Sequence, residues 1–352
     1  MIEIAAVLST MPPHRPMPSP APGPTRRALL AATAGSVLAA GCTAPSPHPG
    51  APPPPPSVED GAFVMPDGAS LPFRSWLPDD PPQVVMLALH GFNDSRDAWE
   101  VPAPTLTAAG CAIYAPDQRG FGTAPGRGLW AGTDTMVADA AEMARLVAAR
   151  HPGARLVLLG ESMGGAVLMC LATRPALRPA GARYVLAAPA VWGRATMNVF
   201  LRSSLWAAAT LLPGVAVSGS PVRVTASDNR DAIIRLSRDR LTIRDTRFDT
   251  LRGLVDLMDA ADAAAQAFTT EGLFLYGGRD ELVPKESMAT MWHHLPPGGA
   301  RKAFYAGAYH LMLRDHARAV VLGDIVAWLR DPHAPLPSGA DHAAATWLAT
   351  QA

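Results

Sequence analysis

Residues 155–173 restrict the fold of this chain more than any other part of the sequence. They begin with a short apolar run, residues 155–159, which predicts a strand buried on both faces. The turn Gly160-Glu-Ser162-Met-Gly164-Gly follows directly, and residues 166–173 then favour a helix. A serine at the centre of a tight glycine turn between a strand and a helix is the arrangement called a nucleophile elbow.

Steric reasoning predicts why glycine stands on both sides of this serine. A serine on so sharp a turn occupies strained backbone, and a side chain at Gly160 or Gly164 is expected to collide with the neighbouring strand or helix. The helix after the turn points its N-terminus at Ser162, where backbone amides favour developing negative charge. The pattern therefore predicts Ser162 as a nucleophile beside an anion-stabilising helix end.

The first 58 residues differ in composition from the rest of the chain. Much of the excess among 36 prolines lies there, including the run from Pro52 to Pro56. Arg26 and Arg27 precede an apolar stretch that is too short to span a bilayer and ends in small residues before Cys42. We therefore interpret residues 1–41 as an export signal and residues 42–58 as a proline-rich linker.

The small-small-Cys ending resembles a bacterial lipoprotein signal, in which Cys42 is lipidated and becomes the mature N-terminus. This resemblance implies a protein on the periplasmic side of an envelope membrane, anchored by Cys42, with its folded part outside the cytoplasm. The paired arginines also resemble a twin-arginine signal, although Ala28 departs from that pattern. The alternative is an alanine-rich segment that ends in an incidental free cysteine.

Strand and helix patterns alternate through residues 59–331. Two alternating runs flank Asp67-Gly68 and predict a hairpin over residues 62–76. Helices are expected at residues 134–150 and 315–330, and Cys111 and Cys170 are expected to be small buried hydrophobes. Buried strands are predicted at residues 84–89, 111–116, 155–159, 184–188, 272–276 and 302–305. This order predicts an α/β fold with a mostly parallel sheet covered on both faces.

Residues 190–268 interrupt the alternation. Residues 197–212 are apolar, whereas residues 228–267 are helical in pattern and heavily charged. The apolar part is either the wall of an acyl pocket or the packing face of a helix. Residues 332–352 are expected to form a loose C-terminal tail.

A serine nucleophile needs a histidine base and an acid that orients it. Asp280 follows the predicted strand at 272–276, and His310 follows the last predicted strand, so both lie at carboxyl ends of strands. The chain order Ser162, Asp280, His310 matches the order found with this type of elbow. Other residues also fit the chain order or lie near the expected positions. They are Asp256, Asp259, Asp262 and Glu281 for the acid and His293, His294 and His316 for the base.

Two backbone amides are expected to bind the oxyanion. One belongs to Met163, directly after the nucleophile, and the other to Phe92 in the sequence His90-Gly91-Phe92. The sequence contains no phosphate-binding loop, paired-cysteine zinc pattern or metalloprotease helix, so no metal and no cofactor are predicted. The formal net charge of zero indicates no nucleic-acid partner.

From residue 61 to about residue 330 the chain resembles the serine hydrolases grouped with monoacylglycerol lipases and bacterial lysophospholipases. The resemblance rests on residues 73–78, 90–92, 117–120, 160–165, 277–284 and His310. It implies an α/β-hydrolase fold with an eight-stranded sheet and a helical cap at about residues 190–268. It also implies that Ser162, His310 and Asp280 act on a carboxylic ester. Two histidines usual in this family are replaced here by Asp94 and Phe121. The resemblance therefore still implies ester chemistry, but it does not imply specificity for monoacylglycerol.

The leading hypothesis from the sequence is a serine hydrolase of monoacylglycerol or lysophospholipid-type esters at the envelope. Hydrolysis of small carboxylic esters, or of amides as in an aminopeptidase, is the alternative, because the same fold and triad serve both. A non-catalytic binding protein is the third hypothesis. The sequence predicts no oligomeric state.

Overall fold

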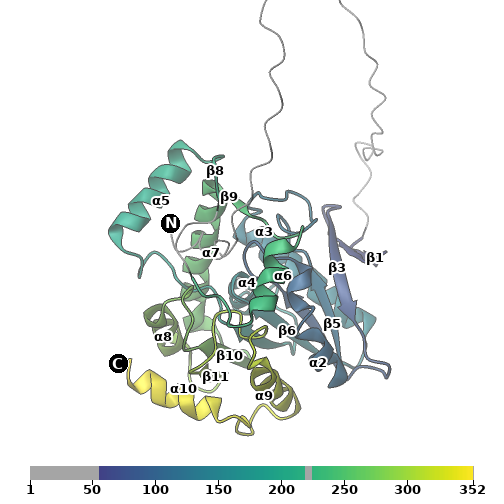
Figure 1. Ribbon diagram of the computed structural model, residues 1–352. Helices are drawn as coiled ribbons and strands as arrows, with labels where there is room; N and C mark the ends of the chain where they lie inside the picture. Colours follow the sequence, from purple (N-terminus) through teal and green to yellow (C-terminus); the bar gives the residue numbers. More distant parts are fainter. Residues whose placement is uncertain (1–54, 219–223, 352) are drawn as a thin grey trace, which may run out of the picture.

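The computed structural model describes residues 55–218 and 224–351. The predicted export signal, Cys42 and most of the proline-rich linker lie outside these residues. A nine-stranded sheet forms the centre of the molecule (Figure 1) in the order β1-β2-β3-β5-β4-β6-β7-β10-β11. Its strands are β1 (Ser57–Glu59), β2 (Ala62–Val64), β3 (Ser70–Trp76), β4 (Val84–Leu89), β5 (Cys111–Pro116), β6 (Arg155–Glu161), β7 (Arg183–Ala187), β10 (Gly272–Gly277) and β11 (Ala300–Tyr305).

The strands from β5 to β11 in this order are parallel to one another, whereas β1, β2 and β3 pair antiparallel, β3 also with β5. The predicted α/β-hydrolase fold with a mostly parallel sheet is confirmed. The hairpin at residues 62–76 is also confirmed, with Phe63 opposite Leu71. The expected strand count of eight is wrong, because Ser57–Glu59 pairs with β2 as a ninth strand that is too short to show an alternating pattern.

Helices cover both faces of the sheet, and side chains alternate between two cores. One face carries α3 (Thr133–Arg150), α4 (Met163–Ala172), α7 (Phe248–Ala264) and α8 (Lys285–His294). The opposite face carries α2 (Ala103–Ala108) and α9 (Arg318–Arg330). The central strands β4, β5 and β10 are buried along their whole length, which explains their continuous apolar sequences. Cys111 and Cys170 are free and buried, as expected.

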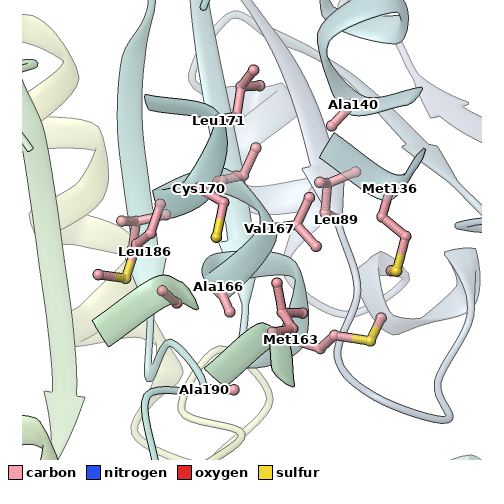
Figure 2. Packing of buried hydrophobic residues seen from close by; sticks show 14 of the residues in the cluster. Leu89, Met136, Ala140, Met163, Ala166, Val167, Cys170, Leu171, Leu186 and Ala190 are labelled. Atoms are coloured by element: carbon pink, nitrogen blue, oxygen red, sulfur yellow. The ribbon is translucent and has the colours of Figure 1, made fainter. Parts of the chain in front are cut away.

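Helix α4 lies at the centre of the first core, and all ten of its residues are buried. Figure 2 shows Val167 and Cys170 among side chains from the sheet and from α3, including Leu89, Leu186 and Met136. A helix enclosed on all sides cannot shift without repacking its neighbours. The residue before α4, Ser162, is therefore held by a completely buried helix.

The chain between β7 and β10 forms the predicted insertion. It contains α5 (Val199–Leu211), β8 (Ala216–Ser218), α6 (Arg230–Arg238), β9 (Asp245–Arg247), α7 and the 3₁₀ helix Ala265–Ala267. Strands β8 and β9 pair as a separate two-stranded sheet, so the charged region at 228–267 is only partly helical. Helix α7 packs against α4 and belongs to the layer that covers the sheet.

Helix α5 buries only Leu205 and Ala209, on the side that packs toward α7. Leu201 is partly buried against the same core, whereas Val199, Phe200, Trp206 and Leu211 face outward, with Phe200 80% and Trp206 64% exposed. The packing interpretation therefore holds for one side of α5.

The expectation of a loose tail after residue 332 is wrong. Residues Ala340–Ala349 form α10, which packs on β11 (Figure 1). Trp347 is buried and stacks on Phe304, with ring centroids 4.8 Å apart and planes inclined by 5°. The flat apolar surface of Phe304 gives the tail a packing site that a sequence pattern does not reveal.

The last core helix begins at Arg318, not near Asp315 as expected. Asp315 instead accepts hydrogen bonds from the Tyr309 amide and the Ser227 hydroxyl, which holds residues 309–315 as a loop. His316 consequently lies before α9 and is exposed. Across residues 55–218 and 224–351, no helix is both long enough and apolar enough to span a membrane.

Candidate active site

Ser162 occupies the strained position that the elbow pattern predicts. Its φ is 52° and its ψ is −115°, outside the regions that residues with a Cβ normally adopt. The Ser162 amide donates to the carbonyl of Ala187 at 2.9 Å, and the Ser162 carbonyl accepts from Ala166 and Ala190. These three bonds fasten the turn to β7 and to the first turn of α4.

Glycine is required on both sides of the serine, as expected. A Cβ at Gly160 would lie 2.6 Å from the nitrogen of Gly165, and a Cβ at Gly164 would lie 2.2 Å from the carbonyl oxygen of Leu89. Both distances are far below van der Waals contact, and both atoms belong to backbone that cannot give way. At Gly91 a Cβ would meet the Cβ of Ser162 at 3.4 Å, an ordinary van der Waals contact, which shows that the loop after β4 lies directly beside Ser162.

Asp280 and His310 lie side by side at the carboxyl ends of β10 and β11. The His310 Nδ1 atom is 2.8 Å from Asp280 Oδ2, and both side chains are almost completely buried. Asp280 Oδ1 accepts hydrogen bonds from the amides of Leu282 at 2.7 Å and Val283 at 3.0 Å. These amides hold the carboxylate in one orientation, and the carboxylate holds the imidazole ring.

The protonation of His310 reflects two opposing effects. Burial lowers its pKa, but the negative charge of Asp280 and the hydrogen bond to it outweigh burial, with a further contribution from Glu161. The pKa of His310 therefore lies above that of an ordinary histidine. Above this pKa the resting imidazole is neutral and can accept a proton. The Asp280 carboxylate favours that transfer because it stabilises the imidazolium.

The rival acids and bases lie elsewhere or have other partners. Asp256 and Asp259 on α7 both bind Arg194. Glu281 accepts from the amide of Thr225. His293, His294 and His316 are exposed. Among the sequence candidates, the structure brings Asp280 and His310 into direct contact.

The loop after β4 carries the expected oxyanion residue Phe92 and is held by His90. The amide of Gln118 donates to His90 Nε2 at 3.1 Å, so His90 Nδ1 carries the proton and donates to the Gly91 carbonyl at 2.8 Å. Burial lowers the pKa of His90, which keeps it neutral. Among the turn and loop hydrogen bonds of residues 55–218 and 224–351, none uses the amide of Phe92 or Met163 as donor. Both amides are thus left for another acceptor.

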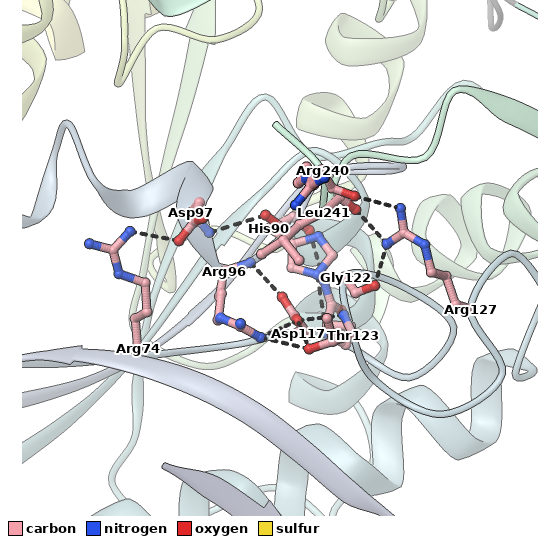
Figure 3. Close-up of polar contacts among 12 residues, drawn as sticks. Arg74, His90, Arg96, Asp97, Asp117, Gly122, Thr123, Arg127, Arg240 and Leu241 are labelled. Carbon is pink, nitrogen blue, oxygen red and sulfur yellow. Dashed lines mark hydrogen bonds and ion pairs between the residues drawn. The ribbon is translucent and has the colours of Figure 1, made fainter. Parts of the chain in front are cut away.

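Asp117 fastens the same loop to the next one along the sheet (Figure 3). Its carboxylate accepts from the Arg96 amide at 2.8 Å and from the Thr123 amide at 2.7 Å. Arg127 then reaches the insertion, where it donates to the carbonyls of Leu241 at 2.6 Å and Arg240 at 3.0 Å. These contacts connect the loops at the carboxyl ends of the strands with the segment between α6 and β9.

A pocket opens between these loops and the insertion. Ser162, His310, Gly91 and Phe92 all line it, together with residues 242, 244 and 246 of the insertion. Asn93, Asp94 and Arg314 also line the pocket, and the rest of its wall is apolar, formed by Ala190, Trp192, Val217, Leu236, Leu254, Met258, Leu282, Val283 and Leu311. No residue of α5 is among the described lining residues, so the apolar stretch at 197–212 is not the wall of this pocket.

The two family histidines that this sequence lacks are replaced by residues with structural contacts. Asp94 lines the pocket and binds Arg314 at 2.8 Å. Phe121 is buried and packs edge-on against both His90 and Phe92, each at 5.7 Å between ring centroids. The ring of Phe121 thus supports the loop that carries the predicted oxyanion amide.

One group of functional candidates, the buried charges around Arg314, is not among the residues predicted from the sequence. Arg314 Nη2 lies 2.8 Å from Asp94 Oδ2 and 2.7 Å from Glu161 Oε2, and all three side chains are buried. The available signal was the charged Glu161 at the end of the elbow strand, which is apolar between Arg155 and Glu161. In the part of the chain that the structure describes, no group of three or more His, Cys, Asp or Glu side chains could hold a metal ion.

A family model described as serine aminopeptidase, S33, matches residues 80–317, which is more than half of the chain. The chain belongs to this family. Among curated relatives, the monoacylglycerol lipase of Mycolicibacterium smegmatis is 25% identical over 284 residues, covering 76% of this chain and 95% of that protein. The monoglyceride lipase of Rattus norvegicus is 22% identical over 274 residues, with 76% and 89% covered.

Solved structures of similar proteins support the fold of this family member. The Paleococcus ferrophilus monoacylglycerol lipase gives a TM-score of 0.60 at 22% identity, covering 74% of this chain and 98% of that one. A soluble variant of the Saccharomyces cerevisiae monoglyceride lipase gives 0.65 at 19% identity, with 82% and 99% covered. The chain is therefore an α/β-hydrolase related to the monoacylglycerol lipases.

Proposed function

We propose that this chain hydrolyses carboxylic esters of monoacyl lipids, of monoacylglycerol or lysophospholipid type, through an acyl-enzyme on Ser162. The monoacylglycerol lipase relatives and the α/β-hydrolase fold indicate a carboxylic ester hydrolase. One observation carries the proposal furthest. Ser162 on its strained turn and the Asp280-bound His310 line the same largely apolar pocket.

The proposed reaction begins with proton transfer from Ser162 Oγ to His310 Nε2 as Oγ attacks the ester carbonyl carbon. His310 Nδ1 keeps its proton on the side of Asp280, whose carboxylate stabilises the imidazolium that forms. The carbonyl oxygen becomes an oxyanion, which the amides of Phe92 and Met163 are proposed to bind. The N-terminus of α4 adds favourable potential at the same point.

The tetrahedral intermediate then collapses. The carbon–oxygen bond to the alcohol breaks, and His310 returns its proton to the leaving alkoxide, so that an alcohol departs and an acyl ester remains on Ser162. Water next gives its proton to His310 and attacks the acyl carbon. A second collapse releases the carboxylic acid and restores the Ser162 hydroxyl.

The pocket favours an ester over the amine-bearing substrate of an aminopeptidase. Recognition of a free amine needs an available carboxylate, and Asp94 is the one acidic side chain among the described lining residues. Its carboxylate is bound to Arg314. The apolar wall is instead suited to an acyl chain.

The test compares hydrolysis of long-chain 1-monoacylglycerol, lysophosphatidylcholine, short-chain p-nitrophenyl esters and an aminoacyl p-nitroanilide. Ser162→Ala is the blank and is expected to reduce turnover by about 10⁶-fold. A preference for the long monoacyl lipids supports the proposal. Turnover of the short esters alone would limit the activity to small esters, and turnover of the anilide alone would overturn ester specificity.

We further propose that Cys42 anchors the protein to an envelope membrane, because a charged start, a short apolar stretch and small residues precede it. A lipid anchor beside an extended linker would bring the pocket close to membrane esters. Fractionation of cells expressing the full chain tests this proposal. Cys42→Ala and globomycin treatment are expected to abolish lipid-dependent processing, and unchanged processing and fractionation would contradict the anchor.

A further inference from the structure

The mechanism above leaves three buried charges without a role. Glu161 directly precedes Ser162, Asp94 lies in the loop that carries Phe92, and Arg314 lies in the loop that carries His310. A single nitrogen of Arg314, Nη2, contacts both carboxylates, at 2.8 Å and 2.7 Å. The exposed fractions of the three residues are 5% for Asp94, 2% for Glu161 and 5% for Arg314.

Burial makes this arrangement costly unless it serves a purpose. Removing ionised groups from water is unfavourable, and apolar residues of similar volume often replace a buried ion pair without loss of stability. The cluster is also incompletely satisfied, since Glu161 Oε1 and Arg314 Nε are buried without a hydrogen-bond partner among the described residues. Stability alone therefore does not account for it.

The position of the cluster suggests what it does. Arg314 joins the elbow strand, the loop after β4 and the loop after β11, which carry the nucleophile, an oxyanion amide and the base. The Arg314 carbonyl accepts from the Asn229 side chain at 2.8 Å, which fixes the loop from a third side. Two carboxylates and one guanidinium leave one formal negative charge beside the histidine.

We propose that Glu161 and Arg314 are positioning residues that hold the His310 loop against the elbow. Their charges also adjust how readily the His310 imidazole accepts a proton. The inference rests on the proposed function. Glu161 favours the imidazolium and Arg314 opposes it, so their balance adjusts a basicity of His310 that burial and Asp280 mainly determine. The electrostatics agree in sign: the Glu161 charge raises the pKa of His310 and the Arg314 charge lowers it, while burial and Asp280 have larger effects.

Other titratable or charged groups also surround His310. Asp280 approaches from the loop after β10, and Asp315 from the histidine's own loop through the Tyr309 amide. Asp94 and the neutral His90 lie in the loop after β4, and Arg244 lines the same pocket from the insertion. The variants proposed below leave all of these groups unchanged. Burial raises the pKa of Glu161, and the Arg314 guanidinium opposes that rise.

The formal charge of the cluster predicts how the acidic limb, the fall of kcat/KM at low pH, is ordered along the pH axis among the variants. Glu161→Gln neutralises the cluster and is expected to move this limb to lower pH by about one unit. Arg314→Gln leaves two unpaired carboxylates and is expected to move it to higher pH by a similar amount. The double variant restores a single negative charge, so its limb is expected near that of the wild type.

The experiment measures these profiles with a p-nitrophenyl ester, together with labelling of Ser162 by a fluorophosphonate and thermal unfolding. Arg119→Gln is the matched control, because Arg119 also binds two carboxylates, Asp67 in the turn between β2 and β3 and Asp139 on α3. It is expected to lower the unfolding temperature without moving the limb.

Opposite shifts for the two single variants support the proposal. Shifts of the same sign, or no shift in Glu161→Gln, would overturn it. If Arg314→Gln does not fold, Glu161→Gln and the double variant decide by the same criteria. A failure of the proposed function would give a different result. Ser162→Ala would then still be labelled by the fluorophosphonate and would still hydrolyse the ester.

Discussion

Asp280 presents only one of its two carboxylate oxygens to His310. The other oxygen is occupied by the amides of Leu282 and Val283, so the carboxylate cannot rotate without breaking two hydrogen bonds. This division explains how a single aspartate both stays fixed and orients the imidazole. It also makes the role of Asp280 separable from that of its exposed neighbour Glu281.

Replacing Asp280 with asparagine is expected to reduce kcat by about 10⁴-fold, because an amide favours the wrong histidine tautomer while preserving shape. Hydrolysis of a p-nitrophenyl ester measures this loss. Glu281→Gln is the matched control and is expected to keep nearly full activity, since the contact that Glu281 makes among the described residues is with the Thr225 amide. A loss in Glu281→Gln with activity retained in Asp280→Asn would reverse the assignment.

The activity is expected to fall as the pH is lowered through the pKa of His310. A general base must be unprotonated, and the charge of Asp280 holds this pKa above its ordinary value despite burial. The acidic midpoint of kcat/KM should therefore lie above about pH 6.5, the value for a free histidine. A midpoint clearly below that value would show that burial outweighs Asp280.

Gly164 and Gly323 are expected to respond in opposite ways to replacement by alanine. At Gly164 the new Cβ would lie 2.2 Å from the Leu89 carbonyl oxygen, so Gly164→Ala should prevent folding or strongly lower stability. Gly323 lies inside α9 with open space around it, so Gly323→Ala should stabilise the protein by about 0.5–1 kcal/mol. Urea denaturation of both variants measures the contrast, and equal effects would contradict the packing at the elbow.

Trp347→Ala is expected to destabilise the fold by about 3 kcal/mol, because it removes a buried ring that stacks on Phe304 and leaves a cavity. Thr346→Ala, at the exposed neighbouring position, should change stability by less than about 0.5 kcal/mol. Chemical denaturation followed by tryptophan fluorescence and circular dichroism gives both values. A small effect at Trp347 would mean that α10 contributes little to the folded state.

The elements of the site that lie at the ends of strands could be predicted from sequence. Ser162, Asp280 and His310 each follow a short apolar run, and the carboxyl ends of parallel strands necessarily meet at one edge of the sheet. The glycines at 160 and 164 were predictable for a similar reason, since a sharp turn between packed elements leaves no space for a Cβ.

Contacts between distant residues had no comparable signal. Arg314 and Glu161 are separated by 153 positions, and the position of Glu161 in a buried strand does not indicate which distant side chain it contacts. The link from Arg127 to Leu241 spans 114 positions and uses backbone carbonyls, which every residue possesses. Helix α10 has apolar residues at helical spacing, but its packing partner Phe304 lies in a strand that was predicted without reference to it.

Helix α10 has a consequence for the outer edge of the sheet. β11 is the last strand in the sheet order, and α10 crosses beside it from one core to the other, with Ala340 in one core and Trp347 in the other. An uncovered edge strand offers free backbone groups to another chain and promotes aggregation. Because α10 packs against this edge strand, a protein shortened at residue 331 is expected to expose β11 and to self-associate more readily.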